Sequence, residues 1–362
     1  MLFVGVSLGA ILGPAVLARL QDAGGRVAAG ALAYGGAELP LMLDSLLARW
    51  VEPAPLRRAA ARIGERRVEC GCNCDAHVYT CRMRREDNSD GPVKNRALHA
   101  IREALVRFAP GIEVDSKGYT AAFRDNLLPA VAIESFEADL RAGDGNELET
   151  KFRAAHSSSA LAVNAFAPFR TQTCDLRLLN ADPFDHLHFE RKCPTGLRGG
   201  RAPNLDVLLT GPNGVIGIES KLTEYLGRHR AEFSPAYREQ IRDERQGQGY
   251  FREMLRLMDE PDCYVWLDGA QLIKHAFGLA RTFRGRPVTL LYLYWVPLNT
   301  DFSPMFDEHR RELAEFAQRV AGSTPNFKAM SYPELWTSWA EGAPDWLAKH
   351  LDDLAARYLV TI

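Results

Sequence analysis

The stretch NLDVLLTGPNGVIGIESK, from Asn204 to Lys221, constrains the fold more than any other part of the chain. Two apolar, β-branched runs flank a Gly-Pro-Asn-Gly segment, a pattern typical of a β-hairpin with a buried face. The same runs carry two acids and a lysine. Charged side chains beside a core are costly unless something compensates them. The hairpin therefore predicts both a sheet and a functional site on that sheet.

Counting along the hairpin predicts which of its side chains meet. If the Gly-Pro-Asn-Gly segment is a four-residue loop, Thr210 pairs with Val215, and Asp206 lies opposite Glu219. Side chains alternate between faces, so both acids share a face with Lys221. Opposite Cβ atoms are about 4.5–5.5 Å apart, so the two carboxylates repel unless a cation binds between them. Two carboxylates suit Mg²⁺, and the lysine beside them can orient a water or stabilise charge on a phosphate.

These residues resemble the signature of the PD-(D/E)XK nuclease superfamily, which includes many restriction endonucleases and repair nucleases. The resemblance rests on Asp206 and on Glu219-Ser220-Lys221, and extends loosely over residues 147–296; Leu205 stands where the motif has proline. It implies an α/β fold with a restriction-endonuclease-like core, a mixed central β-sheet flanked by helices, and helical additions at both ends. It also implies a Mg²⁺-dependent endonuclease that hydrolyses DNA in restriction, defence or repair, with Mn²⁺ as a substitute.

The resemblance further implies an acid on a helix before the sheet, and a Gln or Lys on a helix after it. Glu147 and Glu149 are the candidate acids and further metal ligands. Glu147 is preferred because it follows Gly-Asp-Gly-Asn at the expected helix start, although a favourable interaction with the helix dipole would explain either acid. Gln271, Lys274 and His275 are candidates on the later helix, and an ordinary amphipathic helix with a polar edge is the alternative.

Periodicity predicts the elements around the hairpin. The continuously apolar run at 288–296 is typical of a strand covered on both faces. The other expected strands are 186–193 and 327–332, and the expected helices are 96–108, 133–143, one from about 144 that carries the two candidate acids, about 237–258, 268–283 with Asp268 as its cap, 307–322 and two Trp-rich helices near the C-terminus.

The N-terminal quarter of the chain fits this pattern poorly. Residues 1–92 are predicted to be a poorly defined extension, either disordered or the result of a start codon assigned too far upstream. Residues 93–362 are predicted to form the nuclease-like domain, with its core at about 145–300. The apolar run at 2–18 contains Pro14 and no preceding basic residue. A membrane anchor is therefore the weaker alternative, and no membrane partner is expected.

Composition bounds the location and the partners. A net charge of −2 excludes a grossly basic nucleic-acid coat protein but leaves room for a local basic cleft. The seven cysteines do not form a secreted disulfide framework, which predicts a cytoplasmic protein. Four of them cluster with His77 between Cys70 and Cys81. Their spacing is tighter than that of zinc-binding pairs, so unrelated cysteines are favoured over a zinc site.

The expected partner is nucleic acid, with DNA preferred, and a homodimer would allow paired cuts. Basic residues between Glu190 and Arg230 form either a phosphate-contacting rim or an ordinary charged surface. Tyr225, Phe233 and Tyr237 either stack on bases or belong to the core. The alternative function is a non-cleaving nucleic-acid-binding protein that retains the nuclease fold. The intact Asp-Glu-Lys set favours the enzyme.

Overall fold

The computed structural model describes residues 90–143, 146–196, 203–239 and 248–362. All of these residues belong to one compact unit of the chain. The expectations for the apolar run at 2–18 and for the cysteines between Cys70 and Cys81 lie outside the described residues. No helix within the described ranges is long and apolar enough to cross a membrane.

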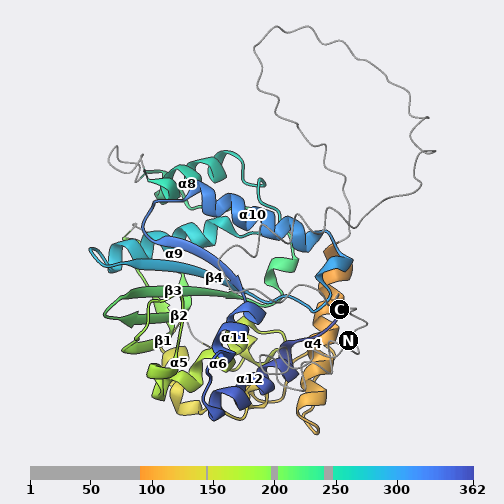
Figure 1. The fold of residues 1–362 in the computed structure, drawn as a ribbon. Helices are drawn as coiled ribbons and strands as arrows, with labels where there is room; N and C mark the ends of the chain where they lie inside the picture. The colour runs from red at the N-terminus through yellow and green to blue at the C-terminus, as the bar shows by residue number, and fades with distance from the viewer. Residues whose placement is uncertain (1–89, 144–145, 197–202, 240–247) are drawn as a thin grey trace, which may run out of the picture. The chain divides into compact units, whose positions relative to one another are not determined.

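A mixed sheet of five strands forms the centre of this unit (Figure 1). Antiparallel pairs join β1 to β2 and β2 to β3, whereas parallel pairs join β3 to β4 and β4 to β5. Parallel neighbours need long crossovers, and helices supply them after β3 and after β4. This is the expected α/β fold. The strands, in their spatial order, are β1 His186–Lys192, β2 Asn204–Gly211, β3 Gly214–Lys221, β4 Val288–Tyr294 and β5 Asn326–Ser331.

Helices precede, interrupt and follow the strands. The α-helices of the described ranges are α4 Asp90–Phe108, α5 Glu137–Arg141, α6 Ser158–Phe166, α7 Pro235–Glu239, α8 Gly249–Asp259, α9 Gly269–Thr282, α10 Met305–Arg319, α11 Tyr332–Ala340 and α12 Asp345–Tyr358. The short 3₁₀ helices are η1 Phe123–Asn126, η2 Ile133–Ser135, η3 Lys151–Arg153, η4 Ala167–Thr171, η5 Thr173–Asp175, η6 Glu224–Leu226 and η8 Thr300–Phe302.

Helices cover both faces of the sheet (Figure 1). On one face α6 contacts β2 and β3, and Ser220 Oγ donates to the carbonyl of Ser158 at 3.3 Å. On the other face α9 packs against β3 and β4. It comes close because Gly217 has no side chain: a Cβ there would lie 2.8 Å from Leu279 Cδ1. Strand β4 is almost fully buried, as its apolar run predicts.

The hairpin register is the one that the sequence predicts. Thr210 pairs with Val215, and the ladder continues to Val207 and Ile218. The loop is shorter than expected, because Gly211 and Gly214 also pair and leave only two residues in the turn. Shortening the loop by one residue on each side keeps the register unchanged, so the positions of the two acids are unaffected.

The helix that was expected to carry Glu147 and Glu149 begins later than predicted. Both acids lie in a turn, and α6 starts after them, where Ser157 Oγ accepts the hydrogen bond of an α6 backbone N–H. Between the acids and α6 the chain is held by a β-bridge from Ala154 to Tyr119. That pairing joins segments distant in sequence, so helical periodicity does not reveal it. The expectation of a helix starting near residue 144 is therefore wrong.

The remaining helices agree better with the sequence. The helix expected at 96–108 is confirmed within α4, and the helix expected at about 237–258 is divided into α7 and α8, with residues 240–247 outside the described ranges. The two ends of the domain pack together. Arg357 of α12 is buried and donates to the carbonyls of Ile101 in α4, at 3.1 Å, and of Ala155, at 2.7 Å.

Candidate active site

The predicted acids lie where β2 and β3 separate. Carrying the register one step past the pair Val207–Ile218 places Asp206 opposite Glu219. At this point the backbone N–H of Ser220 donates to Asp206 Oδ2 at 2.7 Å. The carboxylate of Asp206 is therefore fixed against β3, beside the Glu-x-Lys segment.

Helix α9 completes the surroundings of Glu219 and Lys221. Lys221 Nζ lies 2.6 Å from Glu219 Oε1 and donates to Gln271 Oε1 at 2.8 Å. His275 Nε2 lies 2.7 Å from the other carboxylate oxygen of Glu219, which is only 2% exposed. Gln271 and His275 are four residues apart, so they share one face of α9. Lys274, the third candidate on this helix, contacts the ring of Phe233 instead.

The charges in this site are strongly perturbed. Burial, together with the negative charges of Glu219 and Glu190, raises the pKa of Asp206 well above its usual value. Burial also opposes ionisation of Glu219, but Lys221 and His275 prevail and lower its pKa to about 2. Burial likewise opposes charge on Lys221, yet Glu219, Glu224 and Asp206 raise the pKa of this ammonium. At neutral pH a charged Lys221–Glu219 pair therefore stands beside an acid that gains from a further cation.

Glu190 is a residue of this site that the sequence reasoning missed. The register of β1 on β2 runs from Phe189–Val207 to Arg191–Leu205, which places Glu190 opposite Asp206. Its backbone has a φ of 48°, a left-handed conformation that non-glycine residues adopt rarely and often at functional sites. To find Glu190 from the sequence, one would have had to pair the expected strand at 186–193 with β2 in the correct register.

Glu147 and Glu149 lie in different surroundings. Glu147 Oε1 accepts a hydrogen bond from Ser159 Oγ of α6 at 2.6 Å, whereas Glu149 is exposed. Within the described residues neither acid forms a hydrogen bond or ion pair with Asp206, Glu219 or Lys221.

The donors present fit a hard divalent cation. No group of three or more His, Cys, Asp or Glu side chains is arranged to hold an ion in the described ranges. Asp206 and Glu219 still supply two carboxylates, which suffice for Mg²⁺ when water and phosphate complete the shell. Glu219 Oε2 is buried without a hydrogen bond, since its contact with His275 has ion-pair distance but not hydrogen-bond geometry. That oxygen keeps a lone pair for a ligand, and oxygen donors suit Mg²⁺, Ca²⁺ or Mn²⁺.

A mixed sheet that carries an Asp and a Glu-x-Lys segment on adjacent strands defines the restriction-endonuclease-like class of proteins. The chain belongs to the family described as Restriction Endonuclease associating with ARP, whose model matches residues 93–359. This match spans well over half of the chain and supports a nuclease. The comparisons with curated proteins and with solved structures gave no match.

Proposed function

We propose that this protein is a Mg²⁺-dependent endonuclease that hydrolyses phosphodiester bonds of DNA, with Mn²⁺ as a substitute. The observation that carries the proposal is the meeting of Asp206, Glu219 and Lys221 at the ends of two adjacent strands. Membership of a restriction-endonuclease-like family supports the nuclease part. We extend this nuclease assignment by proposing DNA as the substrate, a divalent metal as the cofactor, and a role in restriction, defence or repair.

Each side chain has a role that its contacts support. Asp206 and Glu219 would hold the metal ion, which when bound polarises a phosphoryl oxygen and lowers the pKa of water. Lys221, kept protonated by its acidic neighbours, stabilises negative charge on the phosphate or orients the attacking water. Glu219 and Gln271 hold that ammonium in place, so it needs little reorganisation during the reaction. Water adds across one P–O bond, and its proton passes to the leaving oxygen or to solvent.

Glu147 suits a supporting role better than Glu149. Its carboxylate accepts a hydrogen bond from Ser159. The preceding residue, Ser158, accepts a hydrogen bond from Ser220 of β3 through its carbonyl. We therefore propose Glu147 as the acid that orients water or adds a ligand when substrate is bound. The exposed Glu149 is the less suitable of the two.

The proposed partners follow from the same reasoning. A homodimer would place two such sites on one duplex for paired cuts, and the cytoplasm is the compartment we propose. The family description names an association with ARP, and we extend that partner to this chain as part of the proposal.

A plasmid-nicking assay tests the proposed function. Wild-type protein with Mg²⁺ is expected to nick and linearise supercoiled plasmid, and Asp206→Ala is expected to lose this activity while keeping its circular dichroism spectrum. Asp185→Ala is the matched control, because Asp185 is an exposed acid that lies just before β1. Cleavage by Asp206→Ala at the wild-type rate would refute the assignment. DNA binding without cleavage under any divalent metal would favour the non-cleaving alternative.

A further inference from the structure

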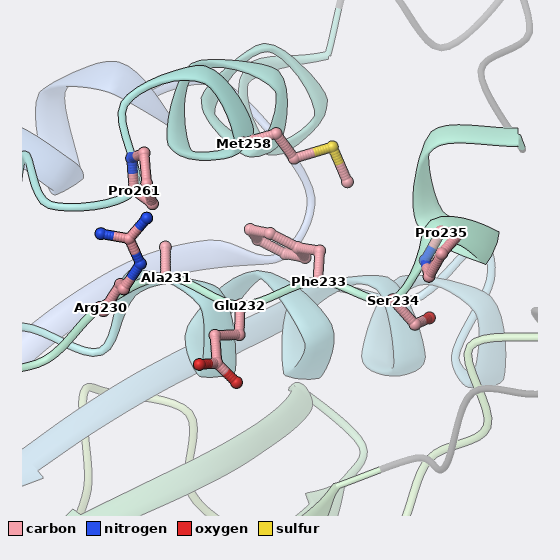
Figure 2. A pocket seen from close by; sticks show the side chains of 8 residues that line it. All are labelled: Arg230, Ala231, Glu232, Phe233, Ser234, Pro235, Met258 and Pro261. Atoms are coloured by element: carbon pink, nitrogen blue, oxygen red, sulfur yellow. The ribbon is translucent and has the colours of Figure 1, made fainter.

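A pocket of about 690 Å³ lies beside the ring of Phe233, which Lys274 of α9 contacts. One wall is the chain segment 230–235, which follows β3 and η6, and the facing wall contains Met258 and Pro261 at the end of α8 (Figure 2). Its volume is within the range of small-molecule sites, which are typically 300–1,000 Å³. The pocket is therefore large enough for a nucleobase with its sugar.

Backbone hydrogen bonds hold the two walls together. The N–H of Ala231 donates to the carbonyl of Pro261, and the N–H of His229 donates to the carbonyl of Val265, each at 2.8 Å. These bonds tie the segment after β3 to the connection between α8 and α9. The pocket is thus formed without a ligand, which lowers the entropic cost of binding one.

Phe233 is the aromatic side chain of this pocket. Its half-buried ring and the side chain of Met258 enter the pocket from opposite walls, while the carboxylate of Glu232 points away from the ring (Figure 2). Lys274 Nζ lies 5.4 Å from the ring centroid, and Tyr237 contacts the ring edge-on at 5.5 Å. The other two aromatic candidates, Tyr225 and Tyr237, are buried. Phe233 is thus the one of the three that is open to a stacking partner.

Lys274 connects this pocket to the candidate active site. It lies on α9 three residues after Gln271, which holds Lys221, so the two side chains leave the helix about one turn apart. The ammonium is partly buried and makes no hydrogen bond or ion pair with any residue of the described ranges. Asp268 and Glu232 act on it only from a distance, and burial lowers its pKa. A desolvated cation of this kind favours a nearby anion such as a backbone phosphate.

We infer that this pocket receives an unpaired nucleobase of the DNA strand whose phosphate lies at Lys221. The base stacks on Phe233 and is covered by Met258, and the adjoining phosphates lie near Lys274 and Arg230. Arg230 is exposed and pairs with the exposed Asp262 at 2.6 Å, an ion pair that a phosphate can replace at little cost. Only an unpaired base offers a free face for such stacking, so the substrate is single-stranded or has a base turned out of the duplex. This inference rests on the proposed function and names its substrate class.

Fluorescent oligonucleotides test the inference without requiring cleavage. The probe is a single-stranded oligonucleotide that contains 2-aminopurine, and it is titrated with protein in EDTA. The protein carries Asp206→Asn, which removes one negative charge from the site. Binding is expected to quench 2-aminopurine, as a stacked ring does. Adding Phe233→Ala should abolish the quench and weaken binding about 5- to 150-fold, the range found when base-stacking aromatics are replaced by alanine. Phe233→Trp should retain both properties.

Phe283→Ala is the matched control for this experiment. Phe283 has the same partial burial and lines another pocket, of about 510 Å³, but it lies just past the C-terminal end of α9. Phe233 contacts Lys274, and the nine residues from Lys274 to Phe283 span about 13 Å along the helix axis. This control should bind and quench as its parent does, and melting temperatures should show that all variants fold.

The outcomes separate this inference from the proposed function. Unchanged affinity and quench in Phe233→Ala would overturn the base pocket, even if wild-type protein cleaves DNA. Equally tight binding of a fully paired duplex, with the same dependence on Phe233, would overturn the requirement for an unpaired base. Quenching that depends on Phe233, in a protein that cleaves no DNA with any divalent metal, would support the pocket and refute the proposed function.

Discussion

Replacing Asp206 by asparagine is expected to make the metal-free protein more stable. The carboxylate lies opposite Glu219 on one strand and opposite Glu190 on the other, and both acids raise its pKa. Asparagine removes this repulsion and keeps an oxygen that accepts the 2.7 Å hydrogen bond from the N–H of Ser220. The change therefore removes a charge conflict without leaving a buried donor unpaired.

The expected magnitude follows from the spacing of opposite residues. Two like charges about 5 Å apart repel by about 3 kcal/mol at an effective dielectric constant near 20. Asp206 experiences two such repulsions, from Glu219 and Glu190, and one attraction, to Lys221. Because the attraction cancels about one repulsion and side chains relax, the net gain for Asp206→Asn should be about 1–3 kcal/mol.

Urea unfolding at pH 7 in EDTA measures this gain directly. For a domain of this size the melting temperature should also rise by about 2–4 °C per kcal/mol. Asp185→Asn makes the same change in net charge at an exposed site and should alter stability by less than about 0.5 kcal/mol. Adding Mg²⁺ should stabilise the wild type and leave Asp206→Asn nearly unchanged. A loss of stability in metal-free Asp206→Asn would refute the claim that the acids repel one another.

Three further predictions concern Gln271 in the site, the buried His350 of α12 and the cap of α6. Gln271→Ala removes the 2.8 Å hydrogen bond to Lys221, so plasmid cleavage should fall about 10- to 100-fold with little change in melting temperature; unchanged cleavage would contradict the positioning role. Burial lowers the pKa of His350 to about 4, whereas this pKa is about 6.5 in the unfolded chain. Between pH 4 and pH 6.5 the unfolded state therefore binds more protons at His350 than the folded state does. Unfolding free energy should therefore fall by about 3 kcal/mol from pH 6.5 to 4 through this group, and His350→Leu should show a correspondingly shallower dependence in urea titrations. Ser157→Ala removes the cap that accepts the N–H of Ala160 at 3.2 Å and should cost about 1 kcal/mol in the same assay, whereas no loss would show that water replaces the cap.

Local signals explain why the hairpin could be predicted. Two apolar, β-branched runs and a Pro-Asn turn fix both the strands and their register within eighteen residues of sequence. The cap of α9 is equally local, since Asp268 Oδ1 accepts the N–H of Gln271 at 2.9 Å. Where the interacting groups are neighbours along the chain, the residues alone predict the structure.

Contacts between distant segments could not be predicted in this way. The position of His275 against Glu219 depends on the close packing of α9 over Gly217, and no local pattern specifies that approach. The place of Glu190 depends on how β1 pairs with β2 across a long connection. Glu147 lies in a turn and not in the expected helix, and the chain that follows it forms a β-bridge between Ala154 and Tyr119. In each case tertiary packing decided the result.

Calorimetric titration with Mg²⁺ tests the central claim most directly, on wild-type protein and on the double variant Asp206→Asn, Glu219→Gln. Plasmid nicking is measured on the same samples. The account predicts that the wild type binds Mg²⁺ and nicks DNA, and that the double variant remains folded but loses both properties. Absence of binding in the wild type, or equal binding in the double variant, would contradict a metal site between these two strands.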